Sequence, residues 1–88
     1  MKDSTILPEV TFTTFIMSLN TSCLVCLGEI PEPTTGENRR DLACAKHTID
    51  TLEMLRQKTE GNLDEEEHAL LTHILYDLKM RYVKAVKE

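Results

Sequence analysis

Apolar residues recur with a helical period in the first part of the chain, from Val10 to Gly28. They stand at positions i, i+3, i+4 and i+7, which predicts a helix over residues 10–28. Its main apolar stripe contains Phe12, Phe15, Ile16, Leu19, Cys23 and Cys26. The opposite face carries Val10, Met17 and Leu24. The stretch contains no charged residue, so we expect both faces of this helix to be covered by protein.

Residues 29–40 interrupt this pattern, because two prolines and Gly36 predict an extended segment followed by a turn. The helical period returns after Asp41, a favourable N-cap residue, and predicts a second helix over residues 41–60. Gly61 then suits the position just past the helix end. One stripe of this helix contains Leu42, Ala45, Ile49 and Leu52. A second stripe, about 100° round the helix, contains Cys44, Thr48, Thr51 and Leu55.

The third predicted helix, over residues 64–86, has the clearest start signal. Asp64 is a good N-cap, and Glu67 stands three residues later, where a capping box needs it. The broad apolar face of this helix contains Leu70, Leu71, Ile74, Leu75, Leu78 and Tyr82. A smaller strip on the far side contains Tyr76, Met80 and Val83.

These patterns together predict one all-α domain over residues 1–88, with an arm at 1–9, a helical hairpin and a third helix. Two helices of this size do not easily surround the first one, so we expect a homo-oligomeric bundle with that helix at its centre. A dimer is the simplest closed form, and so short a chain gains stability from association. The expected interface residues are Val10, Met17, Leu24, Phe12, Phe15 and Leu19.

Charge and composition narrow the possible partners. The chain has 15 acidic and 10 basic residues and a net charge of −5, whereas nucleic-acid binding needs a clustered basic face. The uncharged stretch is too rich in threonine and serine for a membrane span. The opening residues place an acid and a proline before any apolar run, unlike a secretory signal. Three cysteines do not suggest a closed disulfide framework, so we expect a protein of the reducing cytoplasm.

The cysteines stand in two short motifs, C-x2-C at Cys23 and Cys26 and C-x2-H at Cys44 and His47. Thiolate and imidazole groups suit zinc or an iron–sulfur cluster, and residues i and i+3 share a helix face. Both motifs lie at adjoining ends of the expected hairpin. However, His47 faces away from the Leu42 stripe, and free cysteines are common packing residues. Three interpretations stay open: a metal or cluster site, cysteines that only pack, and a redox pair.

No other residues stand at a spacing that catalysis demands. The three glutamates at 65–67 are consecutive, so they splay around the helix and do not form an acid/base pair. His68 and His73 are expected at the surface, and Asp77 and Arg81 are expected to pair at i, i+4. We therefore expect a non-catalytic assembly or adaptor protein, with a zinc or iron–sulfur protein as the alternative.

Four segments carry a resemblance to a known family: TFTTFIMSLNTS, LGEIPEPTTGE, AKHTIDTLEMLRQKTEGNL and EEEHALLTHILYDLKMRYV. They are similar to a small bacterial family, prominent in proteobacteria, that is catalogued as a domain of unknown function. The resemblance covers residues 9–83 and implies a small, helical, cytoplasmic protein without an assigned activity. In the pattern of that family, position 23 is usually small and position 26 is often histidine. Cys23, Cys26 and Cys44 therefore depart from it.

Overall fold

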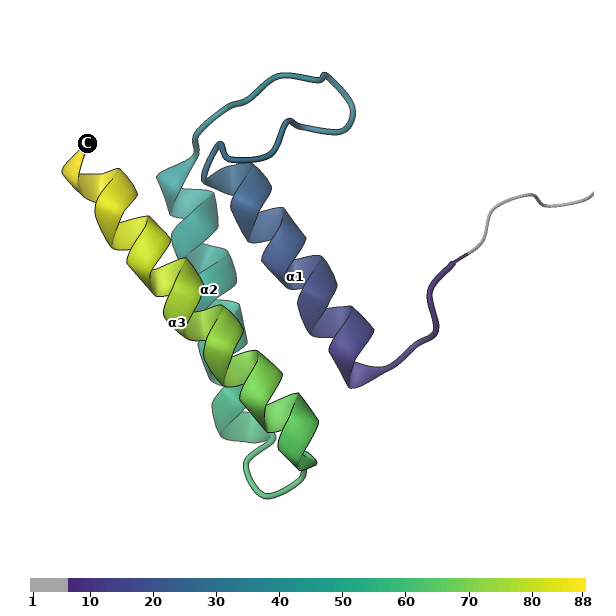
Figure 1. Ribbon diagram of the computed structural model, residues 1–88. Helices are drawn as coiled ribbons and strands as arrows, with labels where there is room; N and C mark the ends of the chain where they lie inside the picture. The colour runs from purple at the N-terminus through teal and green to yellow at the C-terminus, as the bar shows by residue number, and fades with distance from the viewer. Residues whose placement is uncertain (1–6) are drawn as a thin grey trace, which may run out of the picture.

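The computed structural model describes residues 7–88 and contains three helices: α1 (Phe12–Cys26), α2 (Leu42–Lys58) and α3 (Glu65–Lys87) (Figure 1). No strand occurs in this range, so the all-α prediction is confirmed. Figure 1 shows α1 and α2 joined by a long loop at one end and α2 and α3 joined by a short turn at the other. Residues 1–6, most of the expected arm, lie outside the described residues.

Side-chain caps determine where each helix begins. Thr11 and Thr14 form a capping box at the start of α1, where the Thr14 amide donates to the Thr11 hydroxyl at 3.0 Å. The expected N-cap Asp41 accepts a 3.0 Å hydrogen bond from the Cys44 amide, so α2 begins at Leu42. At α3 the predicted capping box is present. The Glu67 amide donates to the Asp64 carboxylate at 2.7 Å, and the Asp64 amide donates to the Glu67 carboxylate at 3.0 Å. These bonds satisfy amides that lack partners within the helix.

The core lies where the three helices meet. All three pairs of helices are in contact. Buried apolar side chains come from every helix: Ile16, Cys23 and Leu27 at α1, Ala45, Ile49 and Leu52 on α2, and Leu71, Ile74, Leu75, Leu78 and Ala85 on α3. Thr48 of the second α2 stripe is also buried, and its hydroxyl donates to the Cys44 carbonyl at 3.0 Å. Both stripes of α2 therefore contribute to the core.

The fold is thin in one direction, with a Cα extent of 16 Å along its shortest principal axis. Because Cα atoms lie about 2.3 Å from a helix axis and packed axes lie about 8–10 Å apart, this extent corresponds to two layers of helices. No helix is enclosed on all sides in such an arrangement, and α1 keeps an outer face in solvent. That face carries Thr13, Phe15, Met17, Ser18, Thr21 and Ser22.

The core placement of Leu52 is open to a direct test. Its side chain is fully buried, so Leu52→Ala leaves a cavity, and we expect the free energy of unfolding to fall by about 2–5 kcal/mol. Met54 on the same helix is 45% exposed, and Met54→Ala is expected to change it by about 0.5 kcal/mol or less. Urea unfolding followed by circular dichroism measures both. Equal losses in the two variants would contradict this placement.

Candidate functional site at the α1–α2 junction

The strongest chemical feature of the molecule is a disulfide between Cys26 and Cys44, with the two Cα atoms 5.8 Å apart. Cys26 is the last residue of α1, and Cys44 lies in the first turn of α2. An antiparallel hairpin places these two ends opposite each other, within the usual Cα range of a disulfide. The odd cysteine count argued against a disulfide, and the structure differs: two cysteines pair and Cys23 is left over.

Non-covalent contacts hold the same junction together. The Asp41 amide donates to the Cys26 carbonyl at 2.7 Å. The Asn38 side-chain amide donates to the Gly28 carbonyl at 2.9 Å, and Gly28 takes a positive φ of 81° that favours glycine. The loop between α1 and α2 is therefore fastened beside both cysteines by its own backbone.

Two ion pairs fasten the loop to α3 as well. Arg81 pairs with Asp77 at 2.7 Å, as the i, i+4 spacing predicted, and also with Glu29 just after α1. These contacts raise the pKa of Arg81, chiefly through its hydrogen bond to Asp77. Arg40, just before α2, pairs with Glu88 at 2.7 Å. The Glu29 and Arg40 contacts join residues far apart in the chain, so their partners had no local sequence signal.

Cys23 differs from the other two cysteines because it is fully buried. Its Sγ lies 3.7 Å from the Ala45 carbonyl oxygen and donates a weak hydrogen bond to it. Burial, and secondarily the charge of Glu29, raises the pKa of the Cys23 thiol to about 11. The group is therefore protonated at neutral pH and packs as a small apolar side chain.

The four residues expected to bind metal do not converge. Cys26 and Cys44 are bonded to each other, Cys23 is buried against the Ala45 carbonyl, and His47 is exposed on α2. No set of three or more histidine, cysteine or acidic side chains is arranged for a metal ion within residues 7–88. This arrangement does not favour a zinc or iron–sulfur site, and the metal hypothesis stays a prediction.

A hollow of about 490 Å³ opens onto the disulfide. Its lining residues are Val25, Cys26, Glu32, Arg39, Arg40, Asp41, Leu42 and Cys44. Both bonded cysteines are half-buried, so the sulfur pair borders solvent, whereas Cys23 does not.

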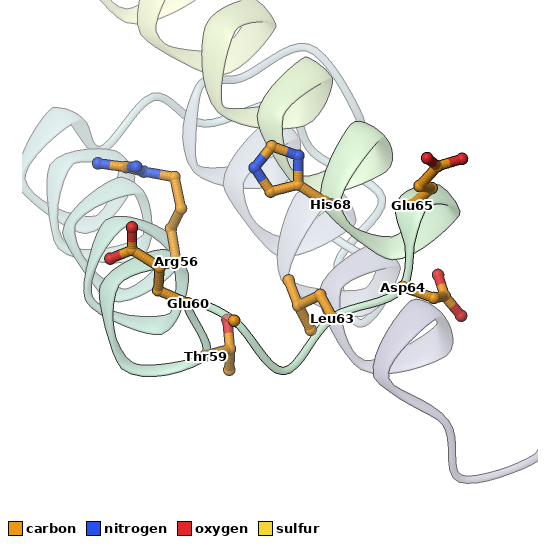
Figure 2. A pocket seen from close by; sticks show the side chains of 8 residues that line it. Arg56, Thr59, Glu60, Leu63, Asp64, Glu65 and His68 are labelled. Atoms are coloured by element: carbon orange, nitrogen blue, oxygen red, sulfur yellow. The ribbon is translucent and has the colours of Figure 1, made fainter.

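A second hollow, of about 330 Å³, lies at the turn between α2 and α3 (Figure 2). Figure 2 shows Arg56 and Glu60 on the α2 side and His68 on α3, with Leu63 in the turn between them. Arg56 pairs with Glu53, and the Asp64 carboxylate caps α3. No hydrogen bond joins Arg56, Glu60 and His68 to one another. The hollow brings charged side chains near one another without a buried acid/base pair.

The contrast between the cysteines can be measured by thiol counting. We expect the disulfide-bonded protein to show no reactive thiol when folded at neutral pH, and one thiol per chain after unfolding in guanidinium without reductant. The reason is that Cys23 is both buried and held in its protonated form. Cys23→Ala should remove the thiol seen after unfolding. A thiol that reacts quickly in the folded protein would overturn the burial of Cys23.

Comparison with known proteins gives one result. A family model described as "Domain of unknown function (DUF1844)" matches residues 9–84. Neither the curated proteins nor the solved structures contain a match. Within residues 7–88, none of the helices combines the length and the apolar composition that crossing a membrane requires.

Proposed function

The chain belongs to the DUF1844 family, and we propose that it is a small non-catalytic assembly or adaptor protein that self-associates through α1. The observation that carries the proposal is the uncharged outer face of this helix. Phe15 and Met17 border this face on opposite sides of the helix and are 49% and 42% exposed, and Val10 just before the helix is fully exposed. Large apolar side chains exposed on one helix are typical of an interaction surface.

A second copy of the chain is the partner that this face fits best. In a two-fold dimer the same patch meets itself, so any charge on it faces a like charge. The chain has a net charge of −5, but α1 contains no charged residue. Pairing through α1 therefore brings two acidic chains together without opposing like charges in the contact.

Two hydroxyl groups of α1 already have acceptors within the chain, which lowers the cost of covering them. The Ser18 hydroxyl donates to the Phe15 carbonyl at 2.7 Å, and the Thr14 hydroxyl donates to the Glu9 carbonyl at 2.6 Å. Groups that already have an internal partner lose less on leaving water than groups without one. Serine and threonine side chains are also short, so a second helix can approach closely.

The six residues expected at the interface fall into two groups. Val10, Phe15 and Met17 are exposed, with Phe15 and Met17 on opposite sides of the helix, and would contact the partner directly. Phe12, Leu19 and Leu24 pack against the core of the monomer and are half-buried. This second group would supply the edges of the contact and support the first.

The competing surface is the outer strip of α3, which carries Tyr76, Met80, Val83 and Val86. Lys79 and Lys84 lie along the same helix, and both are exposed. Two copies pairing through this strip would bring lysines of the same charge together. The exposed fraction of Met80, 55%, is similar to those of Phe15 and Met17, so Met80 supplies a matched control.

The test is the mass in solution of the wild type, Phe15→Lys/Met17→Lys and Met80→Lys, measured by sedimentation equilibrium over a range of concentrations. We expect a dimer or higher oligomer for the wild type and for Met80→Lys. The double variant should be a folded monomer, because both replaced side chains are already half exposed and the new lysines oppose each other across the contact. Circular dichroism checks that its helix content is unchanged.

Either of two outcomes would contradict the proposal. One is a wild type that stays monomeric at every concentration. The other is dissociation by Met80→Lys with the mass of the double variant unchanged, which would move the interface to α3.

A further inference from the structure

We propose that Cys26 and Cys44 form a reversible dithiol–disulfide site that exchanges with small anionic disulfides of the glutathione disulfide class. The inference concerns a different surface from the self-association face and is independent of it. The first observation is the bond itself, which joins the end of α1 to the first turn of α2 at a Cα separation of 5.8 Å.

The second observation is that the junction does not depend on the bond for its shape. The Asp41 amide donates to the Cys26 carbonyl at 2.7 Å. Cys23, about one helical turn before Cys26, contacts the Ala45 carbonyl of α2. Arg40 pairs with Glu88, the residue just after α3. These contacts keep the two sulfur atoms near each other after reduction, so closing the bond is an intramolecular step between positioned groups.

The third observation is access. Both cysteines are half-buried and line the open hollow of about 490 Å³. Arg39 and Arg40 border the same hollow; Arg40 already pairs with Glu88, so Arg39 is the group that suits a carboxylate of glutathione. Two acids also line it, but each already has a donor: Glu32 accepts from the Thr34 hydroxyl at 3.2 Å, and Asp41 accepts from the Cys44 amide. Exposed disulfides are the ones that exchange readily.

The exchange balances in two steps. The thiolate of one cysteine attacks a sulfur of glutathione disulfide, the sulfur–sulfur bond of glutathione breaks, and one glutathione leaves as thiolate. The second cysteine then attacks the protein sulfur of the mixed disulfide and expels the other glutathione. The protein loses two electrons and two protons, and glutathione disulfide gains them as two thiols. Excess glutathione runs both steps in reverse.

Cys23 takes no part in this chemistry, although it stands three residues before Cys26. It is fully buried and protonated at neutral pH, and only a thiolate attacks a disulfide. The site is therefore a pair drawn from two helices and not the C-x2-C motif that the sequence suggested. In a reducing compartment such as the cytoplasm, where we expect the protein, glutathione would keep Cys26 and Cys44 in the dithiol form.

The experiment uses the full chain, equilibrated in buffers of varied glutathione and glutathione disulfide ratio at neutral pH, then quenched with acid and alkylated. Intact mass spectrometry counts the free thiols and the bound glutathione. We expect one two-electron transition from three thiols to one in the wild type, and from two to none in Cys23→Ala. Cys26→Ser and Cys44→Ser should each stop at a chain carrying one glutathione.

Folding is measured on the same samples. We expect circular dichroism to show the same helix content in the oxidised and reduced forms, with a lower melting temperature after reduction, because the bond constrains the unfolded chain. A bond that resists a large excess of glutathione in the folded protein would make it a static cross-link and overturn the proposal. Loss of helix on reduction, or loss of bond formation in Cys23→Ala, would overturn it too.

Discussion

The packing of α2 against both other helices is the constraint on which the rest of the structure depends. Leu52 and Ala45 are completely buried, and both stripes of α2 contribute to the core. Because α2 contacts α1 and α3 together, its orientation determines which residues of both neighbours turn inward. The same orientation brings Cys44 beside Cys26 and turns His47 toward solvent. The chemistry of the junction is thus a consequence of core packing.

The parts of the fold that rest on local signals were predictable from the sequence. The Asp41 cap and the capping box of Asp64 and Glu67 depend on residues within one turn of each other, and both are present. The apolar face of α3 also follows directly from its helical period, since Leu71, Ile74, Leu75 and Leu78 are all buried. The start of α1 was predicted less accurately, at residue 10, whereas the helix begins at Phe12. A capping box between two threonines is a weaker sequence signal than one with a glutamate.

The candidate site was less predictable, because it depends on how α1 and α2 are rotated against each other. Helical period alone put the Leu42 stripe of α2 inward and Cys44 to one side. In the structure α2 contacts both other helices, so the side that carries Cys44 also packs against α1. Two of the four expected ligands, Cys26 and Cys44, therefore bond to each other. The ion pair of Arg81 with Glu29 was missed for a related reason: nothing near either residue in the chain indicates it.

The unequal lengths of the two connections have a consequence for the order in which the protein folds. The turn between α2 and α3 is short, whereas α1 reaches α2 through a loop of residues 27–41. Closing a longer loop costs more chain entropy, and local contacts form first. We therefore expect the α2–α3 hairpin to form first and α1 to dock onto it last. Destabilising changes between α2 and α3 should then slow folding, whereas changes in α1 should mainly speed unfolding. In the reduced chain, where no Cys26–Cys44 bond ties α1 to α2, an undocked α1 could exchange onto the hairpin of another chain, which would make domain swapping a route to an oligomer.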